Sequence, residues 1–192
     1  MKKLIVEALG TGLLAFTAIL SNGDAFAIAS ILAISIIAFG NISGGHFNIS
    51  ITMAMWSRKL ISFMDAIKYS IAQVVGAVLA IALVNMFSDN EILQMGDIMG
   101  GTIGKNTWIV ELIASAVLLI ALFGCMRNKM TIALGVALAH VVLIPLGFMI
   151  NTSLTIAQFF NGGSLYVLLI IAISQIVGGI LAEKLDARLY IK

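Results

Sequence analysis

Long apolar runs alternate with short polar clusters along the whole chain. Ser21-Asn22-Gly23-Asp24 and the 88–106 segment are the clearest interruptions. Because a helix needs about 20 residues to cross the hydrocarbon core of a bilayer, the apolar runs predict six transmembrane helices. These lie near 4–21, 25–41, 66–87, 107–126, 130–147 and 164–185. Two more apolar segments, after Asn48 and Asn151, hold only about ten residues each, and we predict that they are re-entrant half-helices.

The polar landmarks occur twice, about 100 residues apart. Asn48-Ile49-Ser50-Ile51-Thr52 returns as Asn151-Thr152-Ser153-Leu154-Thr155, and the segment 73–80 returns as 175–182. Glu7 and Glu111 each stand near the start of a long apolar run. We therefore predict one domain over 1–192, with repeat one at about 1–87, a connecting loop at 88–106 and repeat two at about 107–192. Three spans per repeat is an odd number, so the second repeat enters the membrane inverted.

Composition assigns the chain to the membrane proteins. Hydrophobic residues make up 61% and charged residues 10%, against about 45–50% and about 25% in soluble domains. The formal net charge of +2 gives no reason to expect a nucleic-acid partner. Lys2 and Lys3 before an apolar run resemble the start of a signal peptide, but cleavage there would remove Glu7 and break the repeat, so we interpret this run as the first span.

The basic residues predict the orientation. When the six spans alternate, only Lys105 falls on one side of the membrane and ten basic residues fall on the other. By the positive-inside rule, both termini are expected in the cytoplasm, and the chain is expected to be a multi-pass protein of the cytoplasmic (inner) membrane. The ten residues are Lys2, Lys3, Arg58, Lys59, Lys68, Arg127, Lys129, Lys184, Arg188 and Lys192.

Inverted half-helices bring two helix N-termini together near the midplane. Each N-terminus carries free N–H groups and roughly half a positive charge. Asn48 and Asn151 stand at the N-cap positions, where the side-chain oxygen accepts from the helix and the amide NH2 is left to donate into a pore. Such a midplane favours neutral polar solutes and repels cations.

Several motifs resemble the aquaporin (major intrinsic protein) family. Ser43-Gly44-Gly45-His46-Phe47-Asn48 is similar to the first signature of that family, and Glu7 and Glu111 resemble its paired glutamates. The resemblance covers nearly the whole chain. It implies six transmembrane helices with two half-helices, a passive channel without cofactor or enzymatic activity, and a homotetramer in which each subunit has its own pore.

The chain departs from the family motif at both half-helices. The family has Asn-Pro-Ala, whereas this chain has Asn48-Ile49-Ser50 and Asn151-Thr152-Ser153. Proline at the first helical position lacks an N–H, so Ile49 and Thr152 each add a donor that needs a partner. We expect Ser50 and Ser153 to supply these partners and to support the half-helices.

A second departure concerns the outer selectivity filter. Alignment to the family places Ile28, His140, Phe148 and Leu154 there, with Gly147 as the alternative to Phe148 and His140 as the polar donor. The family has an arginine where this chain has Leu154. Desolvating water costs more at a less polar filter, so this one suits ammonia, a small polyol such as glycerol, urea or another neutral solute better than strict water selection. We expect His46 in the cytoplasmic vestibule and no metal site, since His46 and His140 have no third ligand in view.

Two alternatives remain open on the sequence. An ionisable group inside a span is a functional candidate, so Glu7 and Glu111 could couple protons in a secondary transporter. Their matching distances before Asn48 and Asn151 favour the structural interpretation, in which each accepts N–H groups from the irregular backbone ahead of a half-helix. The lost prolines and arginine also suit a non-conducting homologue, plugged at the filter.

Overall fold

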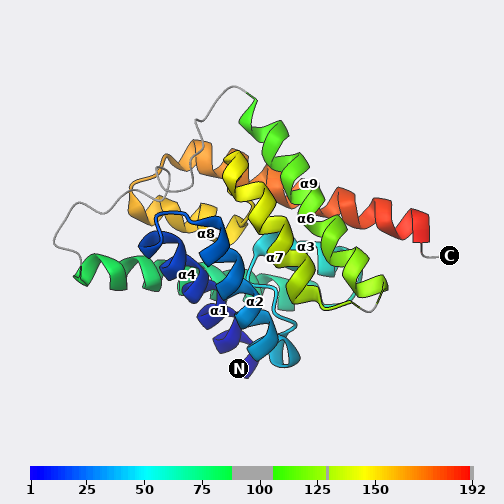
Figure 1. The fold of residues 1–192 in the computed structure, drawn as a ribbon, viewed down its shortest axis with the longest axis horizontal. Helices are drawn as coiled ribbons and strands as arrows, with labels where there is room; N and C mark the ends of the chain where they lie inside the picture. Colours follow the sequence, from blue (N-terminus) through cyan, green and yellow to red (C-terminus); the bar gives the residue numbers. More distant parts are fainter. Residues whose placement is uncertain (88–105, 129, 191–192) are drawn as a thin grey trace.

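Long apolar helices dominate this computed structural model, which describes residues 1–87, 106–128 and 130–190; within these ranges all the regular structure is helical (Figure 1). The first half contains α1 (Lys2–Leu20), α2 (Ala25–Ser43), α3 (Ile49–Ser57) and α4 (Phe63–Phe87). The second half contains α6 (Thr107–Arg127), α7 (Ile132–Leu143), the 3-10 turn η1 (Ile144–Leu146), α8 (Thr152–Ala157), the 3-10 turn η2 (Gln158–Asn161) and α9 (Leu165–Tyr190). The predicted loop at 88–106 lies outside the described residues except for Asn106.

Among the described residues, five helices are long and apolar enough to cross a membrane: α1, α2, α4, α6 and α9. The sixth predicted span, 130–147, is shorter, because the apolar helical segment there covers Ile132–Leu146 and its last turn is 3-10. Pro145 lacks the N–H that an α-helix needs, and Gly147 ends the turn with φ of 85°. The two predicted half-helices are confirmed as α3, of 9 residues, and α8, of 6 residues.

The two halves pack in corresponding ways. α1 lies along α4 in the first half, and α6 lies along α9 in the second. The half-helix α3 packs against α9 and α4, and α8 packs against α4 and α9, so each half-helix touches the long helices of both halves. The chain is therefore an all-α membrane protein built as an inverted repeat, and its half-helices join the two repeats.

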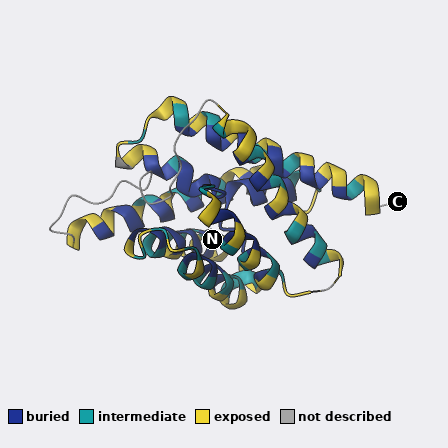
Figure 2. Cartoon of the chain, turned by 45° about the horizontal axis from the view of Figure 1, so that its top comes forward, coloured by how far each residue is buried: buried dark blue, intermediate teal, exposed yellow. Residues whose placement is uncertain are grey.

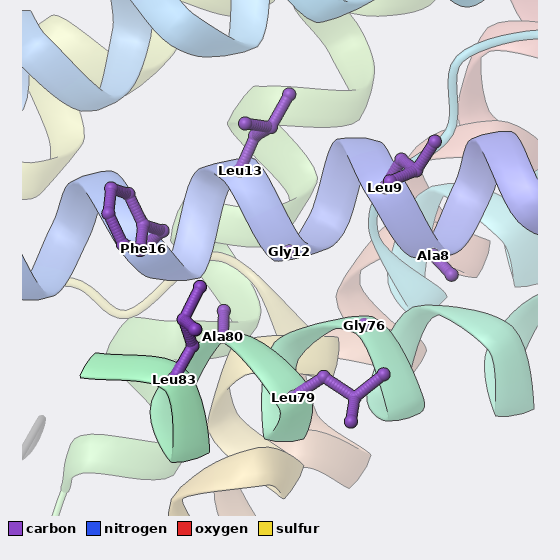
Figure 3. Close-up of a pocket in the computed structure, with 9 residues that line it drawn as sticks. All are labelled: Ala8, Leu9, Gly12, Leu13, Phe16, Gly76, Leu79, Ala80 and Leu83. Carbon is purple, nitrogen blue, oxygen red and sulfur yellow. The ribbon is translucent and has the colours of Figure 1, made fainter. Parts of the chain in front are cut away.

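Glycines set the close approach of the paired helices. A Cβ at Gly76 on α4 would collide with the backbone carbonyl of Ala8 on α1, and a Cβ at Gly178 on α9 would collide with that of Leu112 on α6. An apolar groove lies beside the α1–α4 contact on the outside of the molecule (Figure 3). It is lined by Ala8, Leu9, Gly12, Leu13, Phe16, Gly76, Leu79, Ala80 and Leu83.

The outward faces of the helices are apolar. Figure 2 shows exposed positions along the outer sides of the helices and buried positions between them. Ile34 and Ile37 on α2 and Leu134 and Leu138 on α7 are among many large apolar side chains that are more than half exposed. Since soluble proteins rarely expose such broad apolar surface, these faces are suited to the lipid of a bilayer.

Charged side chains join the C-terminal ends of α3, α6 and α9. Asp186 on α9 is 7% exposed and forms ion pairs with Arg58, which follows α3, and with Arg127 at the end of α6. Beside them, Ser57 Oγ donates to Glu183 Oε2 at 2.8 Å. We call Arg58, Arg127 and Asp186 the ion-pair cluster; it fixes the end of the half-helix α3 to two long helices.

Candidate functional site

Asn48 and Asn151 cap the two half-helices. Asn48 has an extended backbone, and its Oδ1 accepts the N–H of Ser50 at 3.0 Å. Asn151 Oδ1 accepts the N–H groups of Ser153 at 3.0 Å and Leu154 at 3.3 Å. Asparagine is favoured at this position because its short side chain reaches N–H groups that the first helical turn leaves unpaired.

The two half-helices meet at these asparagines. Asn48 Nδ2 donates to the carbonyl of Ile150 at 2.8 Å, and Asn151 Nδ2 donates to the carbonyl of Phe47 at 3.0 Å. We expected each amide NH2 to be wholly available to a pore, and the structure differs, because one hydrogen of each is used to join the halves. Since an amide nitrogen carries two hydrogens, each asparagine keeps one donor for a solute.

The residues before the asparagines have an unusual backbone. Phe47 has φ of 49° and Ile150 has φ of 37°, and both are buried. A bulky or β-branched residue in this left-handed region is strained by about 1–3 kcal/mol. This backbone conformation accompanies the hydrogen bonds from each carbonyl to the asparagine of the opposite half, so the strain is a cost of joining the two halves.

Glu7 holds the backbone that leads into α3. Its Oε1 accepts from Ser43 Oγ at 2.6 Å and the N–H of His46 at 3.1 Å. Its Oε2 accepts from the N–H of Phe47 at 2.8 Å and from Gln73 Nε2 at 2.7 Å. Four donors therefore surround a carboxylate that is completely buried.

Glu111 occupies the matching place before α8, with fewer donors. Its Oε1 accepts the N–H of Met149 at 2.8 Å. Its Oε2 accepts from Gln175 Nε2 at 2.8 Å and from the N–H of Ile150 at 3.4 Å. Gln73 and Gln175 were not predicted as site residues, although two glutamines repeated inside apolar spans are a usable signal.

The two serines of the motifs have different partners. Ser153 Oγ receives the N–H of Ile49 at 3.1 Å. We had expected Ser50 to accept the N–H of Thr152. The Thr152 N–H instead donates to Asn48 Oδ1 at 3.2 Å. Ser50 Oγ is turned away, and lies 2.7 Å from the carbonyl oxygen of Gln175.

His140 offers an unoccupied acceptor. Its Nδ1 lies 2.8 Å from the carbonyl oxygen of Val136 and must donate, because a carbonyl can only accept. In the neutral ring Nε2 is then an acceptor. Nε2 is buried and has no hydrogen-bond partner in the described part of the chain. His140 therefore presents an acceptor rather than the donor that we had expected.

The other predicted filter residues are apolar and differ in burial. Ile28 is 2% exposed and Leu154 is 1% exposed, whereas Phe148 is half-buried against the core. Gly147 stands in the left-handed region at the end of η1. His140 thus has the single polar side chain among the four candidates.

His46 is buried between the half-helix and α4. Its Nδ1 lies 3.1 Å from Thr52 Oγ1, and its ring centroid is 5.3 Å from that of Tyr69. Its backbone N–H belongs to the Glu7 network.

Comparisons with known proteins agree on one family. The family model described as "Major intrinsic protein" matches residues 1–183. "Glycerol uptake facilitator protein-like 6" of Lactiplantibacillus plantarum is 33% identical, with 95% of each chain covered. "Aquaporin Z" of Photorhabdus laumondii is 26% identical, with 99% of this chain and 98% of that protein covered. The fold matches the X-ray structure of the aquaglyceroporin from Plasmodium falciparum with a TM-score of 0.81 and 16% identity, over 99% of this chain and 96% of the other.

The model match, the relatives and the fold lead to one conclusion. The chain belongs to the major intrinsic protein family and is a passive channel, not an enzyme, that carries water or small neutral solutes as an integral multi-pass membrane protein.

Proposed function

We propose that this channel conducts small uncharged solutes of the glycerol class in preference to selecting strictly for water. The selectivity filter consists of Ile28, His140, Phe148 and Leu154, with Gly147 as the alternative to Phe148. The observation that carries the proposal is His140 Nε2, a buried acceptor that has no partner among the described residues, while the other candidate filter residues are apolar. Such a filter offers one hydrogen bond and otherwise apolar contact.

A polyol suits this arrangement because its two sides differ. Its C–H edge can lie against Ile28 and Leu154 without losing hydrogen bonds, while a hydroxyl donates to His140 Nε2. Water has no apolar edge and must give up hydrogen bonds at an apolar wall, which is costly without compensation. The glycerol uptake facilitator-like relative, at 33% identity, supports the same solute class.

The midplane supplies the matching donors and excludes ions. Each of Asn48 and Asn151 keeps one amide hydrogen for a solute oxygen, and the N-termini of α3 and α8 face each other there. Two positive helix ends in a narrow passage oppose cations and protons. Glu7 and Glu111 stabilise the backbone ahead of these ends, and His46 lies on the cytoplasmic side in the vestibule.

The assembly and orientation belong to the same proposal. The protein spans the cytoplasmic membrane with both termini in the cytoplasm, because in this orientation ten of the eleven basic residues lie on the cytoplasmic side. Four copies form a homotetramer with one pore per subunit, as the family resemblance implies. Light scattering of the detergent-solubilised protein tests the tetramer, and a monomeric mass would contradict it.

Stopped-flow light scattering of proteoliposomes tests the solute. Vesicles with and without the protein are exposed to sucrose, and then to glycerol, urea and ammonia gradients. The expected result is glycerol flux well above that of empty vesicles, with a smaller relative gain for water. Fast water flux without glycerol flux would overturn the proposal, and no flux in any gradient would favour the non-conducting alternative.

A further inference from the structure

The first helical residues of α3 and α8 carry N–H groups that a proline would lack. These are the N–H groups of Ile49 and Thr152, and both residues are buried. An unpaired buried N–H loses its hydrogen bonds to water without replacement, so each of these donors needs a partner.

Both partners come from the opposite half of the molecule. Ile49 donates to Ser153 Oγ at 3.1 Å, and Thr152 donates to Asn48 Oδ1 at 3.2 Å. We infer that this exchange replaces the two missing prolines, and that Ser153 is a positioning residue that fixes α3 against α8 and thereby orients the Asn48 amide. The inference rests on the channel function and does not depend on which solute passes.

Ser153 is held in place by a buried chain of hydrogen bonds. Its hydroxyl donates to Gln73 Oε1 at 3.1 Å. Gln73 Nε2 in turn donates to Glu7 Oε2 at 2.7 Å and to Thr52 Oγ1 at 3.0 Å. Because the Ser153 hydrogen is committed to Gln73, a lone pair of the same oxygen is left to receive Ile49. Buried chains of this kind polarise one another and define a single arrangement.

The exchange also determines what Asn48 can offer a solute. Asn48 Oδ1 accepts from both Ser50 and Thr152, and one Nδ2 hydrogen is bound to the carbonyl of Ile150. The amide cannot rotate without breaking these bonds. Its single remaining hydrogen therefore has a fixed direction, and loss of the exchange would remove one of the three bonds that fix it.

The matching serine of the other motif gives a control. Ser50 Oγ lies 2.7 Å from Ser115 Oγ and 2.7 Å from the carbonyl oxygen of Gln175, and it receives no N–H from Thr152. Ser50 and Ser153 have the same sequence relation to their asparagines and are both completely buried. Only Ser153 takes part in the exchange.

A double-mutant cycle tests the inference. Ser153→Ala leaves the Ile49 N–H without its partner, and the thermal unfolding midpoint is expected to fall by about 5 °C. Ile49→Pro removes that N–H, so adding it to Ser153→Ala should raise the midpoint again. The loss of Ile49 packing is common to both backgrounds and cancels in the cycle.

The control cycle uses Ser50→Ala and Thr152→Pro. Here no recovery is expected, because Ser50→Ala leaves the Thr152 N–H bound to Asn48, and Thr152→Pro then removes a bond that is still in use. Recovery in this cycle as well would mean that proline stabilises either half-helix by itself, and it would overturn the inference.

The flux of the same variants separates positioning from stability. Ser153 does not touch the Asn48 side chain, but it holds the N–H of Ile49, the residue that follows Asn48 in the chain. Loss of this bond loosens the start of α3 that carries Asn48, so Ser153→Ala should change the glycerol-to-water permeability ratio, and Ile49→Pro in that background should return it toward the wild-type value. An unchanged midpoint and ratio in Ser153→Ala would overturn the inference. If Ser153→Ala does not fold, the double variant decides: a folded, conducting double variant supports the exchange, and an unfolded one contradicts it.

Discussion

Replacing Glu7 by glutamine tests whether this buried carboxylate is structural. The change keeps the size of the side chain and turns one acceptor oxygen into an NH2 donor. Placed at Oε2, the NH2 would face the Phe47 N–H and Gln73 Nε2, which are both donors and would both lose their acceptor. Placed at Oε1, it would face the His46 N–H and Ser43 Oγ, and a hydroxyl can accept as well as donate.

The second placement is therefore preferred, and it leaves one buried N–H unpaired. The unpaired His46 N–H, together with the loss of charge from the remaining hydrogen bonds, should lower the free energy of unfolding by about 3 kcal/mol. For a chain of this size the expected fall in the unfolding midpoint is about 6–12 °C. Trp56 on α3 and Trp108 on α6 allow the midpoint to be followed by intrinsic fluorescence in detergent.

Glu111→Gln is the matched control. Glu111 accepts three donors, of which the Ile150 N–H is distant at 3.4 Å, and Gln175 can turn its amide to accept from the new NH2. The fall in midpoint should therefore be clearly smaller than for Glu7→Gln. Equal falls in the midpoint of the two variants would refute the argument that the number of donors around each carboxylate determines its contribution to stability. A stable Glu7→Gln protein whose pH-dependent flux had vanished would instead make Glu7 a proton-coupling group.

Three further changes test other parts of the structure. Leu154→Arg adds donors at the filter and should lower the glycerol-to-water permeability ratio in stopped-flow measurements; an unchanged ratio would place residue 154 away from the constriction. Asp186→Asn removes two ion pairs from a carboxylate that is 7% exposed and should cost about 2–4 kcal/mol in thermal unfolding, whereas no loss would show that the ion-pair cluster does not anchor α3. Gly76→Val would press into a backbone carbonyl of α1 and should abolish folded protein by size-exclusion chromatography, while Gly40→Ala, whose Cβ would meet only a methyl group at 3.7 Å, should fold normally.

The sequence predicted those features that depend on length and on local chemistry. Apolar length is a direct requirement of the bilayer, and five of the six predicted spans and both predicted half-helices are confirmed. The two N-caps could be predicted because the Asn48 and Asn151 side chains accept N–H groups from the helices that directly follow them. The predicted span at 130–147 was too long, because the apolar pattern does not distinguish Pro145 from other apolar residues although proline cannot continue an α-helix.

The partners across the two halves could not be predicted from the repeat. Ser50 and Ser153 are equivalent in sequence, but their neighbours differ. In the second half the Ser115 hydroxyl donates to the carbonyl of Gln175 at 2.7 Å and lies 2.7 Å from Ser50 Oγ. The corresponding Thr11 instead donates to the carbonyl of Glu7 in its own helix at 2.8 Å. Ser50 therefore bonds the backbone of Gln175, whereas Ser153 bonds the side chain of Gln73, although the two serines are equivalent in sequence.

The exchange of partners between the halves also constrains how the protein is made. The Phe47 carbonyl and the Ile49 N–H receive their partners from Asn151 and Ser153, which the ribosome adds about 100 residues later, a delay of about 5–20 s. Until then α3 has unpaired polar groups at its N-terminus and cannot settle into the hydrocarbon region at low cost. The first half can thus place its long helices early, but the pore forms only when the second half-helix enters from the other side.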